Sequence, residues 1–350
     1  MEKEFTDKYH FKFNRLIAEG GMGNIYEATL FGDEGFEKRL VIKMVREDIS
    51  QNNDFIKLFI GEAKLVADLV HQNIVQIYKL GKVEGHFYIA MEYVKGINLK
   101  DLIEKHKTMG ELIDVELGAF IISRVCRGLE YAHDKCGIDG KPLGIVHRDI
   151  NPNNLMISVE GEVKVTDFGV AKARDVMEDK EGSVIMGKAP YMSPEQAQGK
   201  VTDRRCDVFA LGIVMYELLT GESLFGNAND ARAIMRNVVD QKIRLPSQLN
   251  SKIPEALEKI IMRALERDAD DRYTDTGKMG FDLEYYMYHK GYGPTIQTLE
   301  KHMRKLYPKL YQKGLPETNL PNGDKTTRDK RFEITAEYEV EYTSCIIFII

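Results

Sequence analysis

Residues 145–169 constrain the fold more than any other part of the sequence, because their second half has the pattern of a β-hairpin. Two β-prone runs are separated by Glu160-Gly161, which fits a two-residue turn. With this turn, counting back along both strands sets Asn154 opposite Asp167, and cross-strand partners have Cβ atoms about 4.5–5.5 Å apart. Taken alone, the pattern favours a surface hairpin with polar ends.

The residues around the hairpin change this interpretation. Hard oxygen ligands such as an amide and carboxylates suit Mg²⁺ held jointly with a phosphate chain. The motifs are His147-Arg148-Asp149, Asn154 and Asp167-Phe168-Gly169. Their combined spacing resembles the catalytic loop and metal-binding motif of the eukaryotic-like protein kinases. The stretch Ala-Pro-Tyr-Met-Ser-Pro-Glu-Gln at 189–196 is similar to the bacterial (Hanks-type) serine/threonine branch, and the resemblance covers residues of about 10 to 288.

The resemblance implies an α+β, two-lobed protein kinase fold. It has a small five-stranded antiparallel β lobe with one key helix, and a larger, mainly helical lobe. We expect an N-terminal tail at 1–10, the N-lobe at 11–95, the C-lobe at 96–288, a helical extension at 289–312, a linker at 313–331 and a strand-like tail at 332–350.

Composition agrees with this expectation. A chain of 350 residues with 43% hydrophobic residues can bury a core, while 30% charged residues and a net charge of -6 favour a soluble protein that does not bind nucleic acid. The four cysteines lack metal-ligand spacing, which predicts thiols in a reducing, cytoplasmic environment. We expect no signal peptide and no membrane span.

A glycine-rich segment follows the first expected strand. Glycine backbone N–H groups can lie against phosphate oxygens because no side chain blocks close approach, although a plain tight turn explains the cluster equally well. The resemblance implies a loop over the ATP phosphates. Its nucleotide-binding residues would be Ile17, Ala18, Gly20, Gly21, Gly23 and Ile25. Ala18 replaces the first glycine of the family pattern, so we expect altered loop mobility.

Lys43 is a cation in an otherwise apolar strand, and an exposed edge position is its plainer explanation. Residues 53–70, however, carry an apolar helical stripe on which Glu62 lies. A carboxylate there is costly unless it is paired, and Lys43 is the natural partner. The resemblance implies that Lys43 binds the α- and β-phosphates and pairs with Glu62.

The resemblance also implies an adenine site. Met91 would gate its back, although a core methionine is the plainer interpretation, and the linker that follows would bind adenine through its backbone. Val41 stands where alanine is commoner, which should narrow the site. The remaining contacts would be Glu92, Val94 and Met156.

Roles in catalysis follow from the same resemblance. Asp149 would accept or orient the proton of the substrate hydroxyl, and Asn154 and Asp167 would hold Mg²⁺, or Mn²⁺ as an alternative, against the β- and γ-phosphates. His147 and Phe168 would be packing residues, and Arg148 would pair with an anionic activation segment.

Asn151 departs from the family pattern, which has a lysine two residues after the aspartate. Loss of that cation could cost about 10²-fold in rate. Lys188 stands where the family usually has threonine, and it could supply the missing ammonium as a catalytic residue. A solvent-facing Lys188 is an equally good interpretation.

Ser183 is the expected phosphorylation site of the activation segment, since phosphate there could pair with Arg148. The neighbouring acidic residues Glu178, Asp179 and Glu181 make constitutive order a competing explanation.

Further positions are expected to be structural. Asp207, in an apolar helix, would brace the catalytic-loop backbone, and the resemblance implies a buried ion pair between Glu195 and Arg272. The Gly/Pro-rich residues 135–144 would form an exposed loop. Residues 295–310 would form a helix with a basic face that packs on the larger lobe, and the alternation after residue 332 predicts a strand of an unfinished module or of a docking segment.

These observations predict a kinase that transfers the γ-phosphoryl group of ATP to serine or threonine hydroxyls of proteins. The alternative is a pseudokinase, an ATP-responsive binding module whose Ala18 and Asn151 mark decayed chemistry. Against it, Lys43, Glu62, Asp149, Asn154 and Asp167 are all present. A tyrosine kinase is less consistent with the motif wording.

Overall fold

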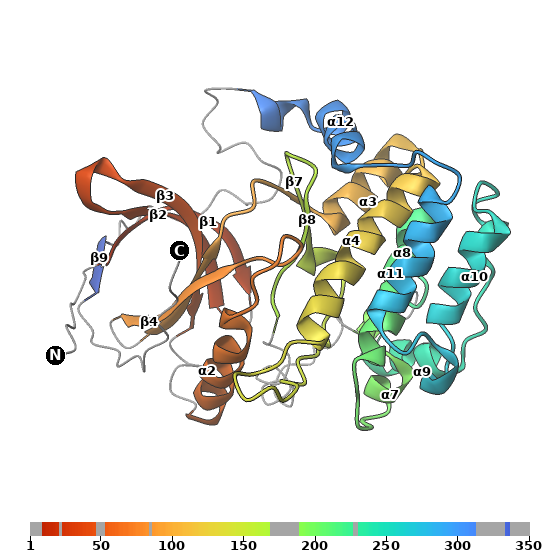
Figure 1. Cartoon of the computed structure of the whole chain (residues 1–350), viewed down its shortest axis with the longest axis horizontal. Coiled ribbons are helices and arrows are strands. Elements are labelled where there is room, and N and C mark those ends of the chain that lie inside the picture. The colour runs from red at the N-terminus through yellow and green to blue at the C-terminus, as the bar shows by residue number, and fades with distance from the viewer. Residues whose placement is uncertain are drawn as a thin grey trace. The chain divides into compact units, whose positions relative to one another are not determined.

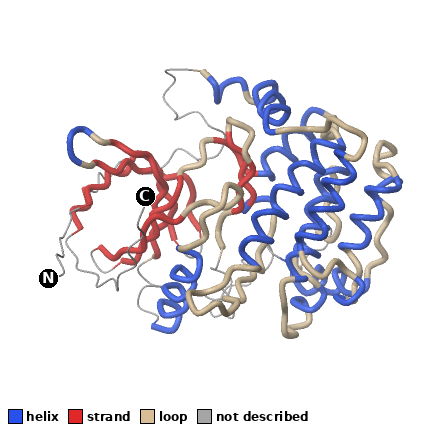
Figure 2. Tube along the Cα trace, viewed as in Figure 1, coloured by secondary structure: helices blue, strands red, loops and turns tan. Residues whose placement is uncertain are grey.

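The computed structural model describes residues 9–20, 23–46, 53–83, 86–168, 189–226, 230–312 and 333–336. The chain forms two compact units (Figure 1). Unit 1 comprises Met1–Asn52, Tyr78–Tyr93 and Asn319–Ile350, and unit 2 comprises Asn53–Ile77 and Val94–Thr318. Strands dominate unit 1, whereas unit 2 is mainly helical (Figure 2).

Unit 1 is built on one sheet with the strand order β4-β5-β3-β2-β1-β9. The five expected strands are present as β1 (Tyr9–Gly20), β2 (Gly23–Phe31), β3 (Glu37–Val45), β4 (Ile77–Val83) and β5 (His86–Glu92). The sixth strand, β9 (Glu333–Ala336), pairs antiparallel with the start of β1, from Tyr9 opposite Ala336 to Lys12 opposite Glu333. The strand predicted from the alternation after residue 332 is therefore confirmed for these four residues, and the rest of that stretch lies outside the described residues.

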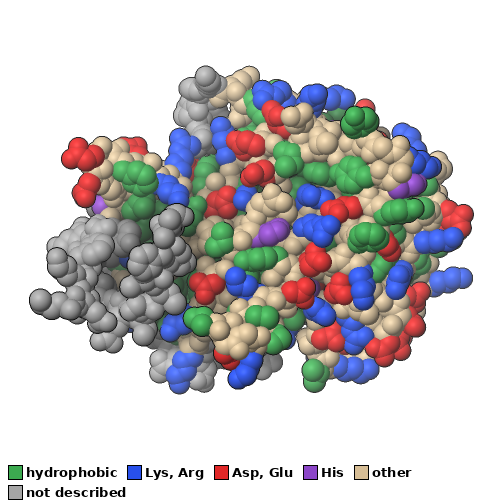
Figure 3. Space-filling view, in the orientation of Figure 1, with side chains coloured by type: hydrophobic (Ala, Val, Ile, Leu, Met, Phe, Trp, Pro, Cys, Tyr) green, Lys and Arg blue, Asp and Glu red, His purple; other side chains and the backbone are tan. Residues whose placement is uncertain are grey.

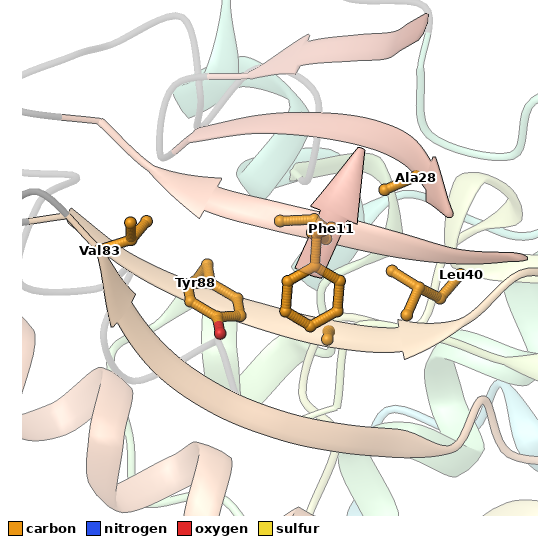
Figure 4. Packing of buried hydrophobic residues seen from close by; sticks show 7 residues of the cluster. Phe11, Ala28, Leu40, Val83 and Tyr88 are labelled. Atoms are coloured by element: carbon orange, nitrogen blue, oxygen red, sulfur yellow. The ribbon is translucent and has the colours of Figure 1, made fainter. Parts of the chain in front are cut away.

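One face of this sheet is closed by a hydrophobic cluster (Figure 4). Because side chains alternate along a strand, every second residue contributes to it. Ala28 pairs with Leu40 across β2 and β3, and the rings of Phe11 and Tyr88 meet edge to face with centroids 5.9 Å apart. The cluster comprises Phe11, Ala28, Leu40, Ile42, Val83, Tyr88 and Ala90. Residues between these positions on β2, β3 and β5 project from the opposite face.

Unit 2 is organised around α8 (Arg205–Thr220), in which every residue from Cys206 to Thr220 is buried. An apolar helix with no polar face needs cover on all sides, so the expected central helix is confirmed. In the described ranges the other helices are α2 (Asn53–Ala67), α3 (Leu99–Met109), α4 (Val115–His133), α7 (Pro194–Ala197), α9 (Ala231–Asp240), α10 (Glu255–Ala264), α11 (Thr276–Tyr288) and α12 (Ile296–Leu306). A small sheet, β6-β7-β8, joins β6 (Gly96–Asn98), β7 (Leu155–Ser158) and β8 (Val163–Val165).

The helix expected over residues 295–310 is present as α12, which packs on unit 2 but ends at Leu306, and Pro308–Tyr311 form a 3-10 helix. Its apolar residues Leu299, Met303 and Leu306 are buried. Beyond its end, the Tyr307 hydroxyl donates to the carbonyl of Asp101 in α3 at 2.9 Å. The outer face is basic, and exposed Lys and Arg side chains gather over this helix (Figure 3).

Two smaller expectations are also confirmed. Residues 135–144 form an exposed loop, closed by a hydrogen bond from Leu143 N–H to the Lys135 carbonyl at 2.9 Å. Cys126, Cys136 and Cys206 are free thiols, and Cys345 lies outside the described residues. Within the described ranges, no helix has the length and apolarity needed to cross a bilayer.

Two histidines join α12 to α3. The Nε2 atoms of His106 and His302 are 3.0 Å apart, and the rings stack with centroids separated by 5.2 Å. Burial, with the neighbouring His106 and Lys305, lowers the pKa of His302 to about 4, and Asp114 opposes this shift. Burial also lowers the pKa of His106, against the opposing effect of Glu111. The pair is therefore neutral at pH 7.

We expect this pair to make unit 2 less stable as the pH falls from about 6.5 toward 4. Over that range the unfolded histidines bind protons that the folded pair resists, so the free energy of unfolding decreases as the pH is lowered. Thermal unfolding at pH 7 and pH 5 should show a smaller loss of Tm in His302→Leu than in the wild type. His289→Leu, which changes an exposed histidine, is the matched control. Equal losses in the wild type and His302→Leu would contradict this role.

Candidate active site

The hairpin of β7 and β8 has a different register from the expected one. Leu155 pairs with Val165, and the N–H of Thr166 donates to the Asn154 carbonyl at 2.9 Å. Asn154 therefore lies opposite Thr166, and the prediction that it faces Asp167 is wrong by one residue. The cause is a three-residue loop, in which Gly161 has a φ of 84° and Ser158 N–H bonds to the Glu162 carbonyl at 2.8 Å.

Glycine is required at position 161 for a second reason. A Cβ there would lie 2.2 Å from the carbonyl oxygen of Ile296, the first residue of α12. The left-handed backbone adds one residue to the loop, and the close approach of α12 leaves no room for a side chain. The turn prediction missed this because the contact joins segments about 135 residues apart.

Asp207 braces the backbone of the segment 147–154, which we call the catalytic loop. Its buried carboxylate, on helix α8, accepts hydrogen bonds from the backbone N–H groups of His147 (2.9 Å) and Arg148 (2.8 Å). The Arg148 carbonyl accepts a further bond from Gln196 Nε2 at 3.0 Å. The N–H and the carbonyl of Arg148 are thus both hydrogen-bonded to residues outside the catalytic loop. These bonds hold Arg148 at a φ of 63°, which is strained for a residue with a side chain. The expected bracing role of Asp207 is confirmed.

The same carboxylate also bonds His133 of α4, with His133 Nε2 2.8 Å from Asp207 Oδ2. Burial alone would raise the pKa of Asp207, but the hydrogen bond from His133, its charge and the bond from the His147 backbone lower it below its usual range. The brace is therefore ionised at neutral pH.

His147 connects the catalytic loop to the segment that leads to Asp167. Its Nδ1 accepts from the N–H of Asp149 at 3.2 Å, so the proton must be on Nε2, which donates to the carbonyl of Thr166 at 3.0 Å. The rings of His147 and Phe168 meet edge to face, with centroids 4.7 Å apart, and both side chains are buried. The expected packing role of this pair is confirmed.

The carboxylate of Asp149 lies between two amides. Asn154 Nδ2 is 3.2 Å from Oδ2 of Asp149 and 2.7 Å from its carbonyl oxygen. Asn151 Nδ2 is 3.3 Å from Oδ1 and 3.0 Å from the same carbonyl oxygen. All three residues are 7% exposed. The loop therefore holds one buried acid in a fixed orientation, as a group that accepts a proton from a positioned substrate requires.

Asn154 and Asp167 fit the expected metal role by donor chemistry. Because Nδ2 of Asn154 is engaged by Asp149, its Oδ1 is the atom available to a cation. Asp167 follows Thr166 directly and has a φ of 60°. The described residues contain no cluster of three or more His, Cys, Asp or Glu that could hold a metal. Two oxygen ligands from the protein, with phosphates and water as the other ligands, match the coordination that Mg²⁺ prefers in proteins.

The activation-segment side of unit 2 is fixed by the expected ion pair. Arg272, whose side chain is fully buried, donates to both carboxylate oxygens of Glu195 at 2.8 Å. Burial would raise the pKa of Glu195, but the Arg272 guanidinium lowers it below its usual range. The expected pair is confirmed.

In unit 1, several candidate nucleotide residues share one face of the sheet. Cross-strand partners project from the same face, and the pairs are Ala18 with Ile25, Ile25 with Lys43, and Val41 with Met91. This face is opposite the cluster in Figure 4. Glu92 pairs with Leu40, so its side chain belongs to the other face, and Ile17 lies at a β-bulge.

Gly23 has a structural reason of its own. It pairs with Gly20 at the end of the β1–β2 hairpin, and a Cβ at position 23 would lie 2.1 Å from the carbonyl oxygen of Met44 in β3. The close approach of two strands therefore requires this glycine, whether or not it also binds phosphate.

In unit 2, Met156 pairs with Lys164 and Asn98, and Val94 is half-buried. Gly21, Gly169, Ser183 and Lys188 lie outside the described residues, as does the side chain of Glu62. The pairing of Lys43 with Glu62, the role of Lys188 and the phosphorylation of Ser183 therefore stay predictions.

A protein kinase domain model matches residues 11–282. The chain belongs to the protein kinase family. The crystal structure of the Mycobacterium tuberculosis PknI kinase domain is 22% identical with a TM-score of 0.59, and the match covers 78% of this chain and 95% of that one. The expected kinase fold is thus confirmed.

Bacterial kinases are also similar in sequence. The tyrosine-protein kinase MasK of Myxococcus xanthus (strain DK1622) is 39% identical over 273 residues, or 78% of this chain and 42% of that protein. The serine/threonine-protein kinase PrkC of Bacillus subtilis (strain 168) is 35% identical over 274 residues, or 78% and 40%. The expected similarity to bacterial serine/threonine kinases is confirmed, and the chain spans about two fifths of the length of these relatives.

Proposed function

We propose that this chain transfers the γ-phosphoryl group of ATP to serine or threonine hydroxyls of proteins. The observation that carries the proposal is the buried Asp149 carboxylate, oriented by two amides in a loop whose backbone Asp207 braces. Such a group can accept the proton of a hydroxyl as that hydroxyl attacks phosphorus. The structural alternative, a surface hairpin with polar ends, does not account for an acid buried in this way.

The nucleotide and the metal would be held by separate sets of residues. Lys43, which is 6% exposed, would bind the α- and β-phosphates, and the apolar side chains that share its sheet face would contact adenine. Asn154 Oδ1 and the Asp167 carboxylate would hold Mg²⁺, which when bound neutralises charge on the phosphates. Asp149 would orient the acceptor hydroxyl and take its proton.

The acceptor residue is tested directly. The chain is incubated with γ-labelled ATP, Mg²⁺ and a general protein acceptor, and the labelled protein is hydrolysed to identify the phosphoamino acids. We expect phosphoserine or phosphothreonine. Phosphotyrosine alone would favour the second candidate, a tyrosine kinase, which the similarity to MasK supports. ATP binding without any transfer would favour the pseudokinase alternative and contradict the proposal.

Two proposals concern the activation segment. We propose that Lys188 supplies positive charge to the reaction, so Lys188→Ala should lower kcat by about 10²-fold, and an unchanged kcat would contradict the role.

We also propose that Ser183 becomes phosphorylated, which mass spectrometry after incubation with Mg-ATP would detect. An active chain with unmodified Ser183 would refute this proposal. The tail, lobe, extension and linker boundaries and a cytoplasmic location stay predictions.

A further inference from the structure

Asn151 stands where the family pattern has lysine, and its side chain bonds both Asp149 and the loop around it. Besides the two bonds that it donates to Asp149, its Oδ1 accepts from the backbone N–H of Asn153 at 3.0 Å and from Asn153 Nδ2 at 3.1 Å. Asn151 is also the N-cap of the short 3-10 helix Pro152–Asn154. One buried side chain thus uses both ends of its amide, the nitrogen toward the acid and the oxygen toward the loop.

The two amides on Asp149 are arranged as a clamp. Asn151 Nδ2 faces Oδ1, Asn154 Nδ2 faces Oδ2, and both also bond the Asp149 carbonyl oxygen. Rotation of the carboxylate in either direction therefore breaks a hydrogen bond. Each carboxylate oxygen has two lone-pair sites, so the bond from one amide does not by itself use up the capacity of that oxygen to accept a proton.

We infer that Asn151 is a positioning residue, which together with Asn154 fixes the Asp149 carboxylate for the acceptor hydroxyl. The inference rests on the proposed function. In this chain the catalytic loop uses a neutral amide at position 151, where a lysine would offer three donors and no acceptor. A lysine could bond Asp149, but it would leave the N–H of Asn153 without its cap.

Asn151→Lys distinguishes a missing cation from a missing clamp residue at this position. If the missing cation limited the rate, restoring the family residue should raise kcat. If the fixed orientation of Asp149 limits the rate, the kcat of Asn151→Lys should not exceed that of the wild type, because the variant loses the N-cap that sets the position of the loop.

The test measures kcat and the KM for ATP in the full chain. Asn151→Asp retains the acceptor for Asn153 but replaces the donor with a carboxylate beside Asp149, and kcat should fall about 10²-fold while the KM for ATP changes less than about 3-fold. In Asn151→Ala, kcat should fall by about 10-fold. Asp275→Ala removes an N-cap of α11, remote from Asp149 in sequence, and controls for loss of a helix cap.

The outcomes separate the inference from the proposed function. Unchanged kcat in Asn151→Asp, or a kcat above the wild type in Asn151→Lys, would overturn the inference while phosphoryl transfer by the wild type stands. A parallel loss in Asp275→Ala would also overturn it, because the effect would then be general destabilisation. A wild type that binds ATP but transfers nothing would overturn the proposed function and the inference together. Melting temperatures establish that each variant is folded.

Discussion

Asp149→Asn is expected to lower phosphoryl transfer by about 10³-fold, within the range that general-base groups contribute. The substitution preserves shape but removes the proton acceptor. It also places an NH₂ group against the amide of either Asn151 or Asn154, so the hydrogen-bonded clamp cannot form completely. Transfer from γ-labelled ATP in the presence of Mg²⁺, compared with the wild type at equal concentration, measures the effect.

ATP binding is the control for Asp149→Asn. Because Asp149 is assigned to the acceptor hydroxyl and not to the nucleotide, the dissociation constant for ATP should change little. A variant that keeps more than about a tenth of the wild-type rate would contradict the role of Asp149 as proton acceptor. Loss of ATP binding would mean that the substitution acts through the structure of the loop.

Arg272→Ala is expected to lower the free energy of unfolding by about 4 kcal/mol, the cost of breaking a buried ion pair by removing one partner. The guanidinium donates to Glu195 and also to the backbone carbonyls of Arg205 (3.2 Å), Glu266 (2.8 Å) and Arg267 (3.0 Å). All of these acceptors lose a partner in the variant. For a domain of this size, a change of that order corresponds to a fall in Tm of roughly 10 °C.

Denaturant unfolding measures this loss, and Arg304→Ala is the matched control. Arg304 also pairs with a glutamate, Glu300, at 2.7 Å, but its side chain is exposed, so its removal should cost less than about 0.5 kcal/mol. If the free energy of unfolding falls by similar amounts in the two variants, burial does not make the Arg272 pair more stabilising than an exposed pair.

The Arg272 pair also has a consequence for acid stability. The pKa of Glu195 is held below its usual range in the folded chain, so the stability from this pair is present above about pH 4.3 and is lost as the pH falls through the folded pKa. Arg272→Ala should therefore show a weaker decline of stability below that pH than the wild type. The comparison separates this group from the other carboxylates that titrate in acid.

The resemblance to the kinase family predicted contacts between residues that are far apart in the chain. We expected Asp207 to brace the loop backbone, and its carboxylate accepts a hydrogen bond from the N–H of His147. We also expected the ion pair of Glu195 with Arg272, which is present. Strand alternation also predicted β9, and the apolar pattern predicted the buried helix α8. These predictions succeeded because periodicity and motifs can be recognised from the order of residues in short stretches of the sequence.

Other features could not be derived in that way. The register of the β7–β8 hairpin depends on Gly161, where the close approach of α12 leaves no room for a side chain. The bond from Gln196 to the Arg148 carbonyl and the partner strand of β9 had no local signal. Asn151 did carry one, since an asparagine directly before proline is typical of an N-cap, but that pattern does not show that the amide nitrogen bonds Asp149.

The amino-acid sequence was enough to predict the family, the fold class and which residues carry oxygen and nitrogen ligands near the catalytic loop. The orientation of those groups, including the side of Asp149 that each amide occupies and the strained φ of Arg148, is known only from the folded chain. A hydrogen bond depends on a few tenths of an ångström and on direction. Both are set by contacts such as those of Asp207 and Gln196, which residue order alone does not specify.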